Sequence, residues 1–142
     1  MNLLANKIRG VEVFLASKSP RRQELLKNII EDFQIITKEI KEEYPDNLAV
    51  NEIAPFLSEL KAKSYLESSN EKNLFITADT IVVIDNKVLG KPTDFNHAEK
   101  MLKQLSGNKH TVYTGVSILH NKNIITFQDS TKVTFYDLKD RE

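Results

Sequence analysis

The chain has 142 residues, of which 40% are hydrophobic and 28% charged, and this composition excludes a disordered chain and predicts one domain, 1–142. It has no cysteine, which excludes a disulfide framework, a thiolate metal site and a cysteine nucleophile. The sequence has no apolar run of the roughly 20 residues that a membrane-spanning helix needs, and no signal-peptide pattern at its start. We therefore expect a soluble, cytoplasmic protein without a membrane partner.

Twenty basic and twenty acidic residues give a net charge of zero. The charge is uneven, with a net of +4 over residues 1–30, −6 over 31–71 and +2 over 72–142. A neutral chain has no broad positive field with which to hold a nucleic-acid backbone. We therefore expect no nucleic-acid partner. A few positioned cations suit a small phosphate ligand better than a polymer.

The beginning of the chain is predicted to form a strand followed by a helix. Val13–Ala16 is a short apolar run typical of a strand. Ser19 then suits the N-cap of a helix and Pro20 its first position, where a missing N–H costs nothing. Helical spacing of the following apolar residues predicts that this helix buries a stripe made of Leu25, Leu26, Ile29 and Ile30.

The next segment is predicted to contain a strand, a loop and a second helix. The strand is expected over Phe33–Thr37, and the acidic stretch Glu39–Asp46 is expected to be a loop. Apolar residues at helical spacing predict a helix over about Asn51–Glu67. Pro55 is tolerable in that helix only if it lies in the first turn.

Strands dominate the second half of the chain. The predicted strands are Leu74–Ile84, Lys87–Leu89, His110–Leu119 and Ile124–Tyr136, with turns at Asp85-Asn86 and Asn121-Lys122-Asn123. Between the second and third of these, Thr93 or Asp94 can cap a helix whose apolar positions are Ala98, Met101, Leu102 and Leu105. Early alternation of strands and helices and later strands predict an α/β domain with a mixed central β-sheet flanked by helices.

The segment Ser17-Lys18-Ser19-Pro20-Arg21-Arg22 lies between the first predicted strand and helix. The first turn of a helix offers unpaired N–H groups and the positive end of the helix dipole. Two guanidiniums and two hydroxyls at that position make a phosphate-binding cradle, because arginine matches phosphate oxygens bidentately. The alternative interpretation is that Ser19 only caps the helix and that the arginines are solvated.

Asp79 lies inside a nearly continuous apolar strand. A carboxylate in such a place is costly unless it is paired, hydrogen-bonded or bound to a metal ion. Asp79 is therefore the best single candidate for a magnesium ligand or a water activator. The alternative is an edge or bulge position at which Asp79 faces water.

Other charged residues are weaker candidates on local chemistry alone. Lys91 lies between Gly90 and Pro92 and can act as a point charge for a phosphate, or it can be a solvated loop residue. Lys61 on the second predicted helix is open to the same two interpretations. Either Glu42 or Glu43 in the acidic loop can complete an oxygen-only magnesium site with Asp79.

Taken together, these segments resemble the Maf family. The matching motifs are Leu15-Ala16-Ser17-Lys18-Ser19-Pro20-Arg21-Arg22 with Glu24-Leu25-Leu26, Ala78-Asp79-Thr80-Ile81-Val82-Val83, and Leu89-Gly90-Lys91-Pro92. Further matches in order are Ala98, Met101-Leu102, Leu105-Ser106-Gly107, His110 and Thr114-Gly115-Val116, and the similarity covers about residues 13–136. Leu57 with Lys61-Ala62 is similar to the family's lysine-bearing helix, and Glu42 lies where the family's loop glutamate is expected.

The resemblance implies an α/β fold related to the inosine triphosphate pyrophosphatases. It implies hydrolysis of a nucleoside triphosphate between the α and β phosphates, giving the monophosphate and pyrophosphate. The Arg21-Arg22 pair after Pro20 is similar to the branch of the family that acts on dTTP and UTP. Members of the family are also called septum formation inhibitors.

The resemblance also implies roles for individual residues. Glu42 and Asp79 would hold a divalent metal ion, Mg²⁺ or Mn²⁺, and Asp79 would also activate the attacking water. Phosphate charge would be neutralised by Arg21, Arg22, Lys61 and Lys91. Ser17 and the free N–H groups near Ser19 would position one phosphate. Arg21 and Thr80 would help to select the base.

The resemblance implies, finally, that the family's usual C-terminal segment is lacking after Glu142. A homodimer is one way to supply the missing face. The alternative function is a non-catalytic nucleotide-binding regulatory protein connected with cell division.

Overall fold

The structure is a computed structural model that describes residues 10–89, 100 and 109–134. Its strands are β1 (Glu12–Ala16), β2 (Gln34–Ile36), β3 (Asn73–Ile84), β4 (Lys87–Leu89), β5 (Lys109–His120) and β6 (Asn123–Thr134). Its helices are α2 (Pro20–Lys27), α3 (Val50–Lys63) and the short 3-10 helix η1 (Leu66–Ser68). Of the helix predicted between residues 93 and 105, only residue 100 is among the residues described, and it is helical; the rest of that helix and Lys91 lie outside them.

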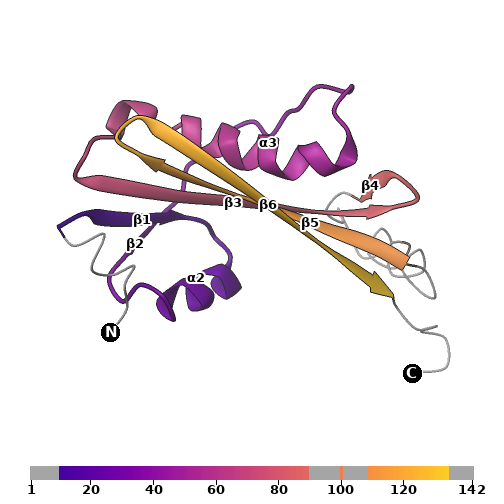
Figure 1. The fold of residues 1–142 in the computed structure, drawn as a ribbon, viewed down its shortest axis with the longest axis horizontal. Coiled ribbons are helices and arrows are strands. Elements are labelled where there is room, and N and C mark those ends of the chain that lie inside the picture. The colour runs from indigo at the N-terminus through magenta and orange to yellow at the C-terminus, as the bar shows by residue number, and fades with distance from the viewer. Residues whose placement is uncertain (1–9, 90–99, 101–108, 135–142) are drawn as a thin grey trace.

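The strands form one mixed sheet in the order β2-β1-β3-β5-β6, and β4 pairs with the far end of β3. β1 is parallel to both β2 and β3, whereas β3–β4, β3–β5 and β5–β6 are antiparallel. Helix α3 covers one face of the sheet and α2 lies on the other, below β1 and β2 in Figure 1. The predicted α/β domain with a mixed sheet flanked by helices is therefore confirmed.

Both predicted hairpins form, and their turn residues explain why. Asp85 and Asn86 have φ of 50° and 63°, and Asn121 and Lys122 have φ of 48° and 69°. Two successive residues with positive φ make a type I′ turn, whose twist matches that of the flanking strands. Asp and Asn tolerate this left-handed conformation better than most residues do.

The core lies between α3 and the sheet. Ile53, Ala54 and Leu57 of α3 pack on Ile81 and Val83 of β3. Further along, a second cluster is formed by Ala62, Tyr65, Phe75 and Leu119. α3 thus lies firmly along the face of the sheet to which the odd-numbered residues of β3 point, and this fixes the position of its last turns.

Gly115 permits the closest approach between α3 and the sheet. A Cβ atom at this position would lie 2.5 Å from the backbone carbon and oxygen of Ala54 and from the nitrogen of Pro55. Atoms at that separation overlap, so any side chain at position 115 would push the helix outwards. The glycine is needed here for space.

The predicted buried stripe on the first helix is wrong. No residue of α2 is buried, and Leu25 and Ile29 are 56% and 47% exposed. The helix has only eight residues and ends at Lys27, so Ile29 and Ile30 are not on it. Its contact with β3 is made by Arg22, a polar residue, and Leu25 lies on another side. Of the four predicted residues only Ile30, beyond the helix, is buried.

The prediction that Pro55 is tolerable only in the first turn of its helix is also wrong. α3 begins at Val50 and ends at Lys63, so Pro55 is its sixth residue and lies beyond the first turn. Proline there cannot donate to the carbonyl of Asn51. The helix is nevertheless retained, because packing of Ile53, Ala54 and Leu57 on the sheet outweighs the loss of one hydrogen bond. The chain predicted as helix to Glu67 instead continues as η1 after a break.

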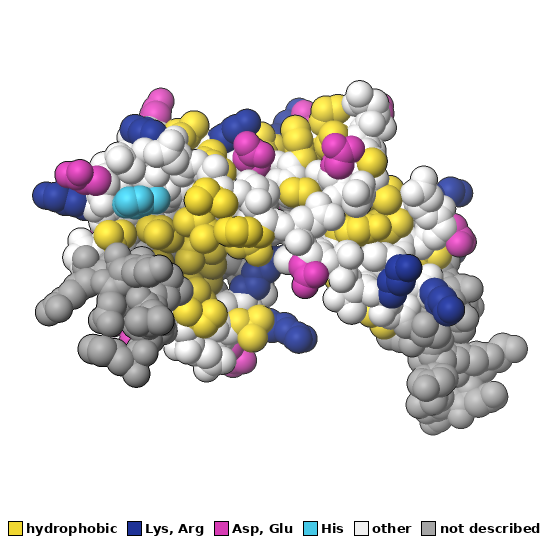
Figure 2. Space-filling model, in the orientation of Figure 1, with side chains coloured by type: hydrophobic (Ala, Val, Ile, Leu, Met, Phe, Trp, Pro, Cys, Tyr) yellow, Lys and Arg dark blue, Asp and Glu magenta, His cyan; other side chains and the backbone are white. Residues whose placement is uncertain are grey.

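None of the helices in the described ranges has the length and apolar character needed to cross a lipid bilayer. Hydrophobic side chains are nonetheless visible on the surface left of centre in the view of Figure 2. The most exposed large ones include Ile125 and Phe127 of β6, at 59% and 54%.

Candidate active site

The first part of the site is the connection from β1 into α2. Ser19 is the N-cap of α2, as predicted, and its hydroxyl accepts a hydrogen bond of 3.3 Å from the Arg22 N–H. The hydroxyl of Ser17, which is 7% exposed, accepts one of 3.1 Å from the Ser19 N–H. Pro20 occupies the first helical turn. The two serines therefore order the start of the helix, where the dipole favours an anion.

Arg22 joins this helix to the middle of β3. Its Nη1 donates to the Ala78 carbonyl over 3.3 Å and its Nη2 to the Thr80 hydroxyl over 2.8 Å. The Thr80 hydroxyl also lies 3.2 Å from that of Thr114 on β5. The guanidinium is therefore held at the two residues that flank Asp79. Arg21, the neighbouring arginine, is exposed.

Asp79 lies at the centre of the site. It is on the interior strand β3, aligned with Gly115 of β5, and its side chain is 14% exposed. Its Oδ1 is 2.9 Å from Lys61 Nζ. The alternative that Asp79 faces water is therefore wrong, although among the described residues β3 has a neighbouring strand only on the β5 side at this position, because its pairing with β1 ends at Thr77 and its pairing with β4 begins at Val82.

Lys61 connects three acceptors from different elements. Besides Asp79, its Nζ lies 2.9 Å from Glu42 Oε1 and donates to the Ala78 carbonyl over 3.2 Å. Lys61 is on the last turn of α3, and its side chain is 22% exposed, against 45% for Glu42. The interpretation of Lys61 as a surface residue is therefore wrong.

The geometry also distinguishes between the two loop glutamates. Glu43 forms an ion pair of 3.2 Å with Lys41, and both side chains are highly exposed. Glu42 instead points to Lys61 and so shares a cation with Asp79. Of the two candidates, Glu42 is the one that joins the cluster.

Burial and charge act in opposite directions on this cluster. Burial raises the pKa of Asp79 above its ordinary value, and the nearby Glu42 charge raises it further, while Lys61 and Arg22 lower it in part. For Lys61, burial lowers the pKa, but the hydrogen bonds and charges of Glu42 and Asp79 together outweigh it and leave the pKa raised. Lys61 therefore keeps its proton, and the Asp79 carboxylate is a stronger base than the carboxylate of a solvated aspartate.

Most of the predicted site residues are thus brought together. Arg22, Lys61, Glu42, Asp79 and Thr80 form one cluster, and Ser17 and Ser19 order the helix from which Arg22 extends. Lys91 lies outside the described residues. Sequence reasoning missed the Ala78 carbonyl and Thr114, because a backbone acceptor and a cross-strand neighbour leave no pattern in the sequence.

The donor set suits a hard divalent cation. Glu42 and Asp79 both direct a carboxylate oxygen to the Lys61 ammonium. Carboxylate oxygens are the protein ligands that Mg²⁺ prefers, and water molecules complete the coordination shell of that ion. Within residues 10–89, 100 and 109–134, no group of three or more His, Cys, Asp or Glu side chains gathers as a metal cage. A site with few protein ligands fits Mg²⁺ bound together with phosphate oxygens.

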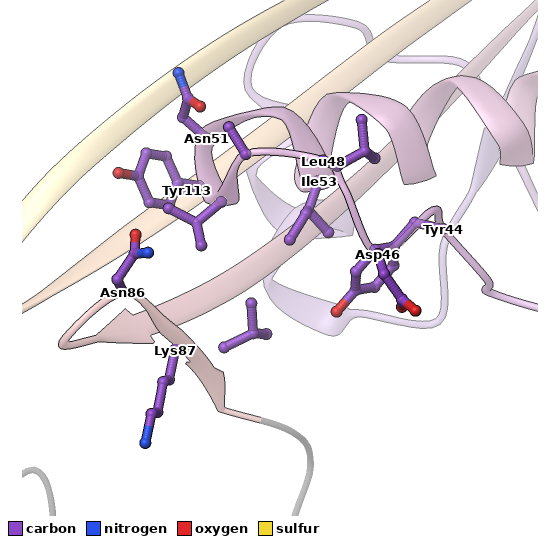
Figure 3. Close-up of a pocket in the computed structure, with 11 residues that line it drawn as sticks. Tyr44, Asp46, Leu48, Asn51, Ile53, Asn86, Lys87 and Tyr113 are labelled. Atoms are coloured by element: carbon purple, nitrogen blue, oxygen red, sulfur yellow. The ribbon is translucent and has the colours of Figure 1, made fainter.

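A separate hollow lies at the other end of α3, with a volume of about 770 Å³. Figure 3 shows Tyr44 and Asp46 on one side of this hollow, with Leu48 and Ile53 next to them. The opposite side is lined by Asn86, Lys87 and Tyr113. None of Arg22, Lys61 and Asp79 lines it. This hollow is therefore separate from the cations and carboxylates gathered around Asp79.

Comparison with known sequences finds relatives that match nearly all of this chain. The chain is 41% identical over 138 residues to a protein named dTTP/UTP pyrophosphatase from Flavobacterium johnsoniae, covering 97% of this chain and 71% of that protein. It is 48% identical over 134 residues to a protein of the same name from Carboxydothermus hydrogenoformans, covering 93% and 71%.

Solved structures share the fold at low identity. The Ham1 protein of Staphylococcus aureus aligns with a TM-score of 0.63 at 15% identity, over 89% of this chain and 72% of that one. A protein described as a nucleoside-triphosphatase or dITP/XTP pyrophosphatase from Mycobacterium abscessus aligns with a TM-score of 0.54 at 13% identity, over 87% and 74%. The predicted relation in fold is confirmed.

The sequence model of the Maf-like proteins matches residues 12–142, a range that contains every residue of the cluster. Together with the two relatives above, this match settles the family. The chain belongs to the Maf-like protein family.

Proposed function

We propose that this protein is a nucleoside triphosphate pyrophosphatase that hydrolyses dTTP and UTP to the monophosphate and pyrophosphate. The observation that carries the proposal is the meeting of Arg22, Lys61 and Glu42 around Asp79. Two cations and two carboxylates at one place can bind a polyphosphate, a metal ion and a water molecule. The names of the related proteins supply the nucleotides to test first.

Phosphate binding is assigned to the cations and to the start of α2. Arg22 is fixed beside β3 by two hydrogen bonds, so little side-chain entropy is lost when phosphate oxygens bind to it. Arg21 and Lys91 would add charge, and Ser17 and the N–H groups near Ser19 would position one phosphate. Positive groups held in advance stabilise the charge that develops on the departing pyrophosphate.

Metal binding is assigned to Glu42 and Asp79. With a divalent ion such as Mg²⁺ or Mn²⁺ bound, the site gains a Lewis acid for the phosphate oxygens and for the attacking water. The two carboxylates are close enough to share the Lys61 ammonium. For both to hold a metal ion, the lysine side chain turns towards the phosphates, where its charge is also needed.

We assign to Asp79 the role of the general base that accepts a proton from the attacking water. Its pKa is raised, mainly by burial, which brings it closer to the value that suits a general base near neutral pH. Lys61 donates a hydrogen bond to this carboxylate and so holds its orientation. Arg21 and the Thr80 hydroxyl, on the other side of the strand, are assigned to selection of the base.

The test is release of pyrophosphate from a panel of nucleoside triphosphates, measured with Mg²⁺ and with chelator. We expect release from dTTP and UTP that requires metal, at 1:1 stoichiometry with the monophosphate. Asp79→Asn is the control against a contaminating hydrolase and should remove activity. Tight binding of dTTP and UTP without cleavage of any nucleotide would instead establish a nucleotide-binding regulatory protein, the alternative function.

A further inference from the structure

A group of hydroxyl side chains that the proposed mechanism does not use connects α3 to the sheet. Its members are Ser58 of α3, Thr77 of β3, Ser117 of β5 and Thr126 of β6. The first three are fully buried, and Thr77 is the cross-strand partner of Ser117. A hydroxyl in the core is costly unless it is hydrogen-bonded. A buried and fully bonded group of this kind therefore favours one specific arrangement of the elements that carry it.

The directions of these hydrogen bonds follow from the one hydrogen that each hydroxyl carries. Ser58 Oγ donates its hydrogen to the Pro55 carbonyl over 3.0 Å, because a carbonyl can only accept. Ser117 Oγ, 2.9 Å away, must therefore donate to Ser58, and Thr126 Oγ1 donates to Ser117 over 2.9 Å. The Thr77 hydroxyl donates to the backbone carbonyl of Ser58 over 2.6 Å. The sheet thus donates two hydrogen bonds to a single residue of the helix.

These two bonds lie next to the contact between Lys61 and Asp79. Ser58 precedes Lys61 by about one helical turn, and helix side chains lean towards the N-terminus, so Lys61 reaches back along α3. Thr77 precedes Asp79 by two residues in β3, and residues two apart in a strand share one face of the sheet. The Thr77–Ser58 hydrogen bond and the Lys61–Asp79 ion pair therefore join the same two elements at neighbouring points.

Apolar packing alone does not fix the position of α3 along β3. The hydrophobic effect is non-directional, so the apolar cluster between these elements tolerates small shifts. Hydrogen bonds weaken steeply when their geometry changes. The close approach at Gly115 limits how near the helix can come, whereas the bonds from Thr77 and Ser117 limit how far it can slide. A displacement of about 1 Å at a reacting group can lower turnover about 100-fold.

We propose that Thr77 and Ser117 are positioning residues, which hold Ser58 and thereby place the Lys61 ammonium against the Asp79 carboxylate. Their hydroxyls act through the helix and not through contact with a nucleotide. The placement of Lys61 is independent of what the protein hydrolyses. The consequence for turnover rests on the proposed function. The competing interpretation is that these hydroxyls only add to the stability of the core, and it predicts different results in the two tests that follow.

The first test is a double-variant cycle measured by chemical unfolding in chelator. Thr77→Val replaces the hydroxyl by a methyl group of similar size, and Lys61→Met removes the ammonium. Effects of independent sites on the unfolding equilibrium constant multiply to within about twofold. We expect the double variant to be less destabilised than the product by more than this, because a misplaced lysine has less stability to lose. Lys63→Met is the control partner, and its effect should multiply with that of Thr77→Val.

Ser117→Ala, which removes the other bond to Ser58, repeats the cycle with Lys61→Met. Products within about twofold for both Thr77→Val and Ser117→Ala would overturn the proposal.

The second test is turnover of dTTP. Thr77→Val should lower kcat about 10- to 100-fold, and Thr77→Ser, which keeps the hydroxyl, should restore most of it. Thr126→Val removes a hydroxyl of the same group that does not bond to α3, and should leave kcat unchanged. Equal turnover of Thr77→Val and Thr77→Ser, whether high or low, would contradict the positioning role. A wild type that cleaves no nucleotide would refute the proposed function, while the unfolding cycle would still decide whether Thr77 places Lys61.

Discussion

The ammonium nitrogen of Lys61 lies 2.9 Å from a carboxylate oxygen of Asp79. The same nitrogen lies 2.9 Å from Glu42, so one lysine neutralises two carboxylates that would otherwise repel each other. These are also the two carboxylates to which we assign the metal ion. Lys61 thus places a cation at the point to which we assign the divalent one.

Asp79→Asn is expected to stabilise the fold at neutral and alkaline pH while removing hydrolysis. Because the pKa of Asp79 is raised in the folded protein, chiefly by burial, the folded state binds its proton more tightly than the unfolded state does. The ionised carboxylate therefore costs stability above the raised pKa, and this cost disappears as pH falls towards the ordinary value of 3.8. Thermal unfolding from pH 4 to 8 should show a gain that shrinks on acidification.

Asp32→Asn, at an exposed position, is the matched control for that experiment and should leave unfolding unchanged. Turnover in Asp79→Asn should fall by at least about 100-fold, the contribution typical of a general base. A lower unfolding temperature for Asp79→Asn at pH 8 would show that the Lys61 contact outweighs burial.

Lys61→Met is expected to tighten Mg²⁺ binding in the absence of nucleotide. The variant leaves Glu42 and Asp79 without their shared cation, so a metal ion no longer competes with the ammonium. Without metal, the fold should lose about 1.5–3 kcal/mol, the range for a hydrogen bond to a charged group. Calorimetric titration with Mg²⁺ measures the first effect and chemical unfolding in chelator the second.

Lys63→Met is the control for Lys61, because Lys63 is on the same helix but 57% exposed and paired only loosely with Glu59 at 3.8 Å. Its Mg²⁺ affinity should equal that of the wild type. Weaker Mg²⁺ binding in Lys61→Met would mean that the lysine helps to hold the metal, contrary to the assignment.

Local sequence signals predicted the elements that carry the site. Ser19-Pro20 defines the start of α2 and the apolar run around Asp79 defines β3, because capping chemistry and strand hydrophobicity act over neighbouring residues. The same signals did not distinguish Glu42 from Glu43. That choice depends on how the loop meets Lys61, an arrangement fixed only when α3 packs on the sheet.

Tertiary contacts also explain the two wrong predictions about helices. The periodicity of Leu25 and Leu26 suggested a buried face, but α2 meets β3 through Arg22, whose bonds to Ala78 and Thr80 are invisible in a hydrophobic pattern. Pro55 lies in the interior of α3 because the packing at Ala54 and Gly115 compensates for its missing N–H. Propensity is a local preference, and packing overrides it.

Arg22→Ala is expected to weaken binding of dTTP much more than binding of thymidine. The guanidinium can give two parallel hydrogen bonds to phosphate oxygens, so its loss should cost about 1.5–3 kcal/mol, or roughly tenfold to a hundredfold in affinity for the triphosphate. Arg22→Lys keeps the charge but not the fork, and should lie in between. Equal losses for thymidine and dTTP would show that Arg22 only braces α2 against β3.

Gly115→Ala is expected to destabilise the protein although it adds a single methyl group. The new Cβ would lie 2.5 Å from backbone atoms of Ala54 and Pro55, which cannot rotate away as a side chain can. Overpacking of this kind costs about 1–3 kcal/mol. Because Lys61 is on the same helix, displacement of α3 should also lower turnover. Chemical unfolding measures the first effect, and Gln128→Ala, at the cross-strand partner of Gly115, should change neither. Wild-type stability in Gly115→Ala would mean that α3 moves freely over the sheet, and the rigid placement of Lys61 beside Asp79 would then be lost.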